Sequence, residues 1–99
     1  MLNIEKNTNE TELTVSLTGR LDTTTAPELE KELKVSLDGV SALTIDMAAL
    51  EYISSAGLRV LLSAQKTMNK QGEMKVVHVG ETIMEIFEVT GFSDILSIE

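Results

Sequence analysis

The chain has 99 residues, of which 42% are hydrophobic and 24% are charged, a composition typical of one folded domain and not of a disordered chain. Its formal net charge of −8 and its three aromatic residues argue against nucleic acid as a partner, because neither a basic surface nor a stacking platform is available. The lack of cysteine excludes disulfides and thiolate metal sites, and a single histidine leaves too few ligands for a metal. We therefore expect no cofactor.

The chain carries no sign of a membrane or secretion segment. Its longest apolar runs are far shorter than a bilayer span, and no basic and apolar signal segment opens the sequence. We expect a cytoplasmic protein with no membrane partner. The negative charge suits a neutral or basic protein partner better than an acidic one.

The N-terminal part of the chain predicts a β-hairpin. Residues 2–6 alternate weakly between apolar and polar side chains, and residues 7–10 have the Asn and Thr typical of a turn. Residues 12–18 alternate strictly, which predicts a strand with one dry face. That face carries Leu13, Val15 and Leu17.

A loop and a helix are predicted next. Residues 19–24 break the alternation and indicate a loop. Residues 25–28, Thr-Ala-Pro-Glu, fit a capping box with the only proline in the first helical turn. The helix is expected to stop at Gly39. Its apolar face carries Leu29, Leu33 and Leu37.

A strand-to-helix junction lies in the middle of the chain. Residues 42–47 predict a short buried strand. Asp46, near its end, is expected to be structural and to accept hydrogen bonds from loop N–H groups. After Ser55 the apolar period becomes helical, which predicts a helix over 55–71 closed by Gly72.

The last third of the chain completes an alternating pattern. Residues 74–79 are almost continuously apolar and predict a central strand covered on both faces. Residues 81–90 predict a third helix ended by Gly91, and residues 94–98 predict a short edge segment. The order β-β-α-β-α-β-α indicates an α/β fold: one domain over residues 1–99, with a mixed sheet of four to five strands and helices mainly on one face.

Two serines sit at the junction between the strand and the central helix. A serine there can cap the helix, which is the more common role, and the free N–H groups and dipole of the helix also stabilise a phosphate. Ala56 and Gly57 add little bulk, so a partner surface could approach the backbone. Because parallel strands point to the same edge of a sheet, Asp22 is expected to lie close to Ser54 and Ser55.

Four successive motifs resemble those of the STAS family. They are Gly-Arg-Leu-Asp at 19–22, Leu-Thr-Ile-Asp at 43–46, Tyr-Ile-Ser-Ser-Ala-Gly-Leu at 52–58 and the stretch from Ile-Phe to Ile-Leu at 86–96. More narrowly, almost the whole chain is similar to the bacterial anti-sigma factor antagonists. The resemblance implies the STAS fold and a regulatory binding protein that is not an enzyme.

The resemblance also implies a partner switch. In this family the free antagonist binds an anti-sigma factor, which is a serine kinase, and so frees the sigma factor. The kinase phosphorylates one serine at the start of the central helix, and the phosphorylated antagonist is released. A serine phosphatase resets the cycle.

The family pattern Asp-Ser-(Ser/Thr/Ala)-Gly-Leu places the phosphorylated serine at Ser55. Ser54 stands where the family usually has aspartate; it is therefore an alternative acceptor, and the missing carboxylate puts kinase recognition in doubt. Asp22 matches the family's Gly-x-(Leu/Ile)-Asp loop, although a turn or capping role is nearly as plausible. The implied partner-binding residues are Asp22, Ser54, Ser55, Ala56, Gly57 and Leu58.

Two rival functions stay open. Ser55, His78 and Asp46 could form a catalytic triad, but the Gly-x-Ser-x-Gly motif is absent and His78 falls within an apolar strand, which favours a structural histidine. The second rival is a STAS docking subunit of a transport ATPase or of a stress-signalling scaffold, which would use the same helix face without phosphorylation.

Overall fold

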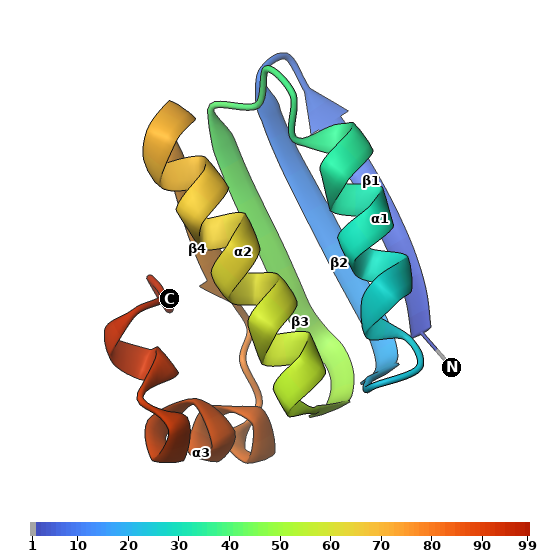
Figure 1. Cartoon of the computed structure of the whole chain (residues 1–99), viewed down its shortest axis with the longest axis vertical. Helices are drawn as coiled ribbons and strands as arrows, with labels where there is room; N and C mark the ends of the chain where they lie inside the picture. The colour runs from blue at the N-terminus through green and yellow to red at the C-terminus, as the bar shows by residue number, and fades with distance from the viewer. Residues whose placement is uncertain (1) are drawn as a thin grey trace.

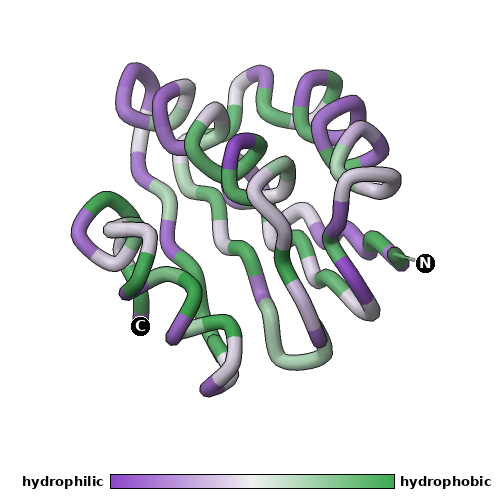
Figure 2. The backbone as a smooth tube through the Cα atoms, turned by 60° about the horizontal axis from the view of Figure 1, so that its bottom comes forward, coloured by the Kyte–Doolittle hydropathy of each residue, from purple (hydrophilic) through white to green (hydrophobic). Residues whose placement is uncertain are grey.

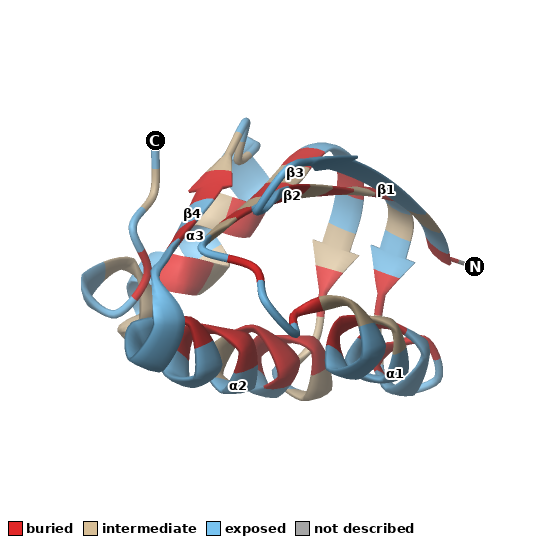
Figure 3. Cartoon of the chain, turned by 90° about the horizontal axis from the view of Figure 1, so that it is seen from above, coloured by how far each residue is buried: buried red, intermediate tan, exposed pale blue. Residues whose placement is uncertain are grey.

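The computed structural model describes residues 2–99, which form a four-stranded sheet with α1 and α2 packed side by side on one face (Figures 1 and 3). The elements are β1 (Leu2–Asn9), β2 (Glu12–Leu21), α1 (Ala26–Ser36), β3 (Ala42–Ile53), α2 (Ser55–Gln71), β4 (Glu73–Val77), α3 (Glu81–Thr90) and the short 3-10 helix η1 (Phe92–Asp94).

The sheet is mixed, as the sequence predicts. Its strand order is β1-β2-β3-β4; β1 and β2 are antiparallel, whereas β2 with β3 and β3 with β4 are parallel. The connections through α1 and α2 therefore return the chain to the same end of the sheet each time. The carboxyl ends of β2 and β3 consequently lie next to each other, at the same end of the sheet.

The two central strands are longer than the sequence pattern predicts. Residues 19–21, expected in a loop, belong to β2, and β3 continues to Ile53 instead of ending at residue 47. The register between the strands shifts twice, between Ser16 and Thr18 and between Gly19 and Arg20, and Gly19 has a φ of 103°. These irregularities break the alternation in sequence, although the backbone pairing continues.

The prediction that the fourth strand is central is wrong. β4 lies at the edge of the sheet and ends at Val77, so His78 follows the strand and is exposed, with a φ of 57°. The tail partly covers this edge: the Val76 N–H donates to the Ser97 carbonyl at 2.8 Å, and Ile98 forms a single parallel bridge with Val76. The expected edge segment over 94–98 is therefore reduced to one bridge.

The core lies between the sheet and the helices. Apolar and polar residues alternate along the strands (Figure 2). The apolar residues are the buried ones, and they form one cluster with the buried residues of the helices. α3 contacts β3 and lies at the end of the molecule where α2 begins (Figure 1). Fully buried side chains come from the sheet and from all three α-helices, including Leu17, Leu29, Ile45, Met47, Leu61 and Phe87.

Gly57 fixes how closely α2 approaches the sheet. A Cβ atom at this position would lie 2.7 Å from Cγ of Leu21 and 2.9 Å from Cγ1 of Ile53, both below any normal carbon–carbon contact. Both neighbours are almost completely buried, so neither can move away freely. Internal packing therefore requires that residue 57 has no side chain.

We expect Gly57→Ala to destabilise the domain. Overpacking a dense core costs about 1–3 kcal/mol, and the better helix propensity of alanine returns about 0.5–1 kcal/mol, so a net loss of about 1 kcal/mol, and at most about 2.5 kcal/mol, follows. Urea unfolding measures the change. Gly80→Ser is the matched control, because a Cβ there meets nothing within 4 Å and serine caps the start of α3 at least as well as glycine. Equal losses in both variants would contradict the packing argument.

Candidate functional site

The carboxyl ends of β2 and β3 lie next to each other, at the same end of the sheet. Leu21 is paired with Ile53, and the Ser54 N–H donates to the Leu21 carbonyl at 2.9 Å. The residue after each strand, Asp22 or Ser54, therefore starts the connection to a helix at the same place. The structure places Asp22 beside the start of α2, as the parallel topology predicts. We call Asp22 together with residues 54–58 the α2 edge.

Ser54 is the residue that caps α2. Its backbone is extended, with a φ of −98° and a ψ of 175°, and its Oγ accepts a hydrogen bond from the Gly57 N–H at 3.3 Å. The hydroxyl thus satisfies one of the N–H groups that a helix leaves free at its start. The side chain is half-buried. A serine cap at this junction was predicted, and the structure assigns it to Ser54 and not to Ser55.

Ser55 is the first residue of α2, and its side chain does not cap the helix. It is exposed, and its hydroxyl makes no hydrogen bond with any residue in 2–99. The following residues become progressively less accessible: Ala56 is half-buried, whereas Gly57 and Leu58 are buried, Leu58 with 5% of its surface exposed. Of the predicted α2 residues, Ser55 is the one whose side chain is accessible to a partner.

The Asp22 carboxylate is turned onto its own loop. Its Oδ1 accepts from the Thr24 hydroxyl at 2.8 Å, from the Thr24 N–H at 3.0 Å and from the Thr25 N–H at 3.1 Å. Its Oδ2 lies 3.9 Å from Nε of Arg20, whose guanidinium also sits over the Tyr52 ring at 4.5 Å. The sequence analysis weighed a turn or capping role for Asp22 against a binding role; the contacts assign it the turn role at least.

The capping box predicted at residues 25–28 is wrong. Thr25 already has helical backbone angles and makes no side-chain cap bond. Its buried hydroxyl instead joins the end of β2 to the loop, accepting from the Asp22 N–H at 2.8 Å and donating to the Arg20 carbonyl at 2.8 Å. The signal that could have revealed this is the run Asp-Thr-Thr-Thr, because Asp and Thr side chains bond to backbone groups a few residues away.

Hydrogen bonding lowers the pKa of two carboxylates. The Thr24 hydroxyl is the largest cause of the lowered pKa of Asp22; bonds from Thr25 add to it, and desolvation opposes it. The backbone N–H of Ala48 is the largest cause of the lowered pKa of Asp46, which also bonds His78. Both side chains are therefore charged acceptors near neutral pH.

The residues of the proposed triad do not come together. His78 Nδ1 lies 3.0 Å from Asp46 Oδ1, but Asp46 is in the middle of β3 and six extended residues separate it from Ile53, a span of roughly 20 Å. Ser55 bonds to neither of them. Asp46 does not end its strand, and its N–H donor, Ala48, belongs to β3 as well. No group of three potential metal ligands occurs among residues 2–99.

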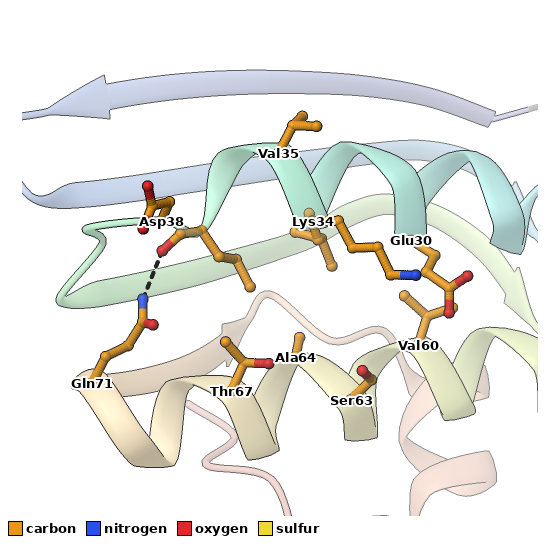
Figure 4. Close-up of a pocket in the computed structure, with 11 residues that line it drawn as sticks. Glu30, Lys34, Val35, Asp38, Val60, Ser63, Ala64, Thr67 and Gln71 are labelled. Atoms are coloured by element: carbon orange, nitrogen blue, oxygen red, sulfur yellow. Dashed lines mark hydrogen bonds between the residues drawn. The ribbon is translucent and has the colours of Figure 1, made fainter.

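A groove of about 670 Å³ runs between α1 and α2 (Figure 4). Small residues of α2, Ser63, Ala64 and Thr67, line one wall. Gln71 closes one end by donating to the Leu37 and Val40 carbonyls at 2.6 and 2.7 Å. The groove starts after the α2 edge and shares no residue with it.

Among the described helices, none is long and apolar enough to cross a bilayer.

Comparison with known proteins identifies the family. Residues 3–99 match the family model described as the STAS domain. The chain belongs to the STAS domain family. This STAS domain is 36% identical over 88 residues to the protein BtrV of Bordetella bronchiseptica, covering 87% of this chain and 76% of BtrV.

Two further relatives are named as anti-sigma factor antagonists. The anti-sigma-B factor antagonist of Bacillus subtilis is 30% identical over 98 residues, covering 98% of this STAS domain and 90% of the relative. The crystal structure of an anti-sigma factor antagonist from Mycobacterium paratuberculosis superposes with a TM-score of 0.88 at 27% identity, covering 99% of this chain and 85% of the other. These relatives place this STAS domain among the anti-sigma factor antagonists.

The two serines should differ in their effect on stability. Ser54→Ala removes the cap of α2 and is expected to cost about 1 kcal/mol. Ser55→Ala removes a hydroxyl without a partner and introduces the best helix former, so its effect should stay within about 0.5 kcal/mol. Urea unfolding of the two variants measures the difference. A larger loss for Ser55→Ala would show that Ser55 is the cap.

The lowered pKa of Asp22 predicts a dependence of stability on acid. A carboxyl with a lower pKa in the folded state contributes stability that is complete above the unfolded pKa, about 3.9, and is lost as the pH falls through the folded pKa. Asp22→Asn keeps the Oδ1 acceptor and removes this titration. The melting temperature of Asp22→Asn should fall less steeply than that of the wild type between about pH 5 and pH 2.

The exposed Asp38, which makes no hydrogen bond within residues 2–99, provides the control. Asp38→Asn should follow the wild-type acid profile. If Asp22→Asn and Asp38→Asn change the profile equally, the bonds to Asp22 do not matter for stability.

Proposed function

We propose that the α2 edge of this STAS domain binds an anti-sigma factor that is a serine kinase, and that phosphorylation of Ser55 releases this partner. In the unphosphorylated state the antagonist would occupy the anti-sigma factor and free the sigma factor. A serine phosphatase would restore the binding state. Because the partners named are bacterial regulators of transcription, the proposed location is the cytoplasm.

The observation that carries the proposal is the free hydroxyl of Ser55. An exposed serine whose Oγ has no internal hydrogen bond can enter a kinase active site without unfolding the helix that bears it. Ser54 is a poorer phosphate acceptor, since it is half-buried and its Oγ accepts a hydrogen bond from the Gly57 N–H. The geometry therefore favours Ser55 over the alternative Ser54.

The chemical step is a phosphoryl transfer. The Ser55 Oγ would form a bond to the γ-phosphorus of ATP as the bond from that phosphorus to the bridging oxygen of ADP breaks, and the hydroxyl proton would leave to a base or to water. The product carries about −1.5 to −2 charges at neutral pH. At a helix N-terminus this charge is tolerated, so the antagonist should stay folded.

The change in affinity must therefore arise at the interface. A partner that covers Ser55 would have to desolvate a phosphate, which costs several kcal/mol unless cations meet it. Each 1.4 kcal/mol weakens binding tenfold. Gly57 and Leu58 would act indirectly, by fixing the first turn of α2 on the sheet, because both are buried. Asp22 would contribute through the shape of the neighbouring loop.

The decisive experiment compares three variants. Ser55→Ala should keep binding to the anti-sigma factor and should not be phosphorylated by it. Ser55→Asp should stay folded and bind more weakly, as a partial mimic with a single charge. Ser54→Ala is the control and should still accept phosphate. Mass spectrometry after incubation with ATP and the kinase locates the modification, and calorimetry gives the affinities.

Two outcomes would change the conclusion. Phosphate on Ser54, or undiminished phosphorylation of Ser55→Ala, would move the switch by one residue. No phosphate on either serine while the partner still binds would favour the docking subunit that acts without phosphorylation.

A further inference from the structure

Arg59 is a charged residue of α2 that the proposed switch leaves without a role. It is exposed and lies one turn after Ser55. No ion pair or hydrogen bond joins its side chain to any residue in 2–99. In a chain with twice as many acidic as basic side chains, an arginine without an internal carboxylate partner is unusual enough to examine.

Arg59 has no compensating charge nearby on its own helix in the unmodified protein. The positive end of the helix dipole acts mainly on the first turn, where proteins usually place acidic residues, and Arg59, the fifth residue of α2, lies just beyond that turn. The first turn of α2 has no acidic residue. The side chains three and four positions away from Arg59 are also uncharged: Ser55, Ala56, Leu62 and Ser63.

Helix geometry directs Arg59 toward Ser55. Side chains four residues apart have Cβ atoms about 5–6 Å apart, and long side chains lean toward the N-terminus of their helix. A pair in which the anion precedes the cation by four residues is also the more favourable order. Phosphorylated Ser55 would be an anion four residues before Arg59, on the side toward which the arginine side chain leans. Ser63 follows Arg59 by four residues, so it lies on the opposite side.

We propose that Arg59 is the internal counter-ion of phosphorylated Ser55. This inference rests on the proposed function in one respect, that Ser55 becomes phosphorylated. The guanidinium group presents a planar fork of donors that fits two phosphate oxygens at once. Arg59 would hold the phosphate against the first turn of α2 and favour its dianion. A cation of the partner would then have to compete with Arg59, which makes release of the partner more complete.

The titration of the phosphate tests the pair directly. The protein is produced with phosphoserine encoded at position 55, so that no kinase is needed, and the second pKa of the phosphate, about 6, is followed by ³¹P NMR. The second ionisation changes the phosphate charge by one unit, so loss of an i,i+4 ion pair of about 0.3–0.5 kcal/mol corresponds to a pKa shift of about 0.2–0.4 unit. We expect the pKa to rise by about 0.2–0.4 unit in Arg59→Gln and to return part of the way in Arg59→Lys.

Lys66→Gln is the matched control. It removes one positive charge from the same helix, about 16 Å along the axis from Ser55 and beyond the Debye length at physiological salt. The phosphate pKa of this variant should equal that of the wild type. The same pKa in Arg59→Gln as in the wild type, or an equal rise in Lys66→Gln, would overturn the counter-ion role. Failure of the kinase to modify Ser55 would overturn the proposed function but not this measurement.

Discussion

The parallel pairing of Leu21 with Ile53 is the contact on which the α2 edge depends. It brings together two chain segments that are about thirty residues apart, and the Ser54 N–H bond to the Leu21 carbonyl continues the pairing by one residue. The first turn of α2 then rests directly on both strand ends, which is possible because residue 57 has no side chain. A rigid platform of this kind holds an exposed residue in one place, which recognition by a partner requires.

The polar groups of the edge are divided between structure and exposure. The Ser54 hydroxyl caps the helix, and the Asp22 carboxylate accepts hydrogen bonds from the loop before α1. Each of these groups stabilises the fold through its internal hydrogen bonds. Ser55 alone keeps an unused hydroxyl at an exposed helix start. Modification of Ser55 can therefore change the surface charge without removing an internal hydrogen bond.

The sequence predicted the order of elements, the mixed sheet and the proximity of Asp22 to Ser54, because these follow from apolar periodicity and parallel topology. It failed where tertiary contacts override the local pattern. The extension of β3 to Ile53 depends on pairing with an irregular β2, which the alternation cannot reveal. His78 was assigned to a strand since its neighbours are apolar, yet it takes a left-handed conformation after the strand ends. The choice of cap between adjacent serines depends on one backbone angle, the ψ of Ser54, which no sequence pattern fixes.

A neutral cap also affects what phosphorylation costs. The family pattern has aspartate where this chain has Ser54, and a carboxylate next to phosphorylated Ser55 would place two anions about 6 Å apart. In a solvent-exposed site the repulsion amounts to about 0.7 kcal/mol for each unit of phosphate charge, thus about 1 kcal/mol or more in total. Ser54 retains the hydrogen bond to the Gly57 N–H without this repulsion. The only charged side chain within one helical turn of Ser55 along α2 is then that of Arg59, a cation. The first turn of α2 is therefore electrostatically better suited to the phosphorylated serine than to the free one.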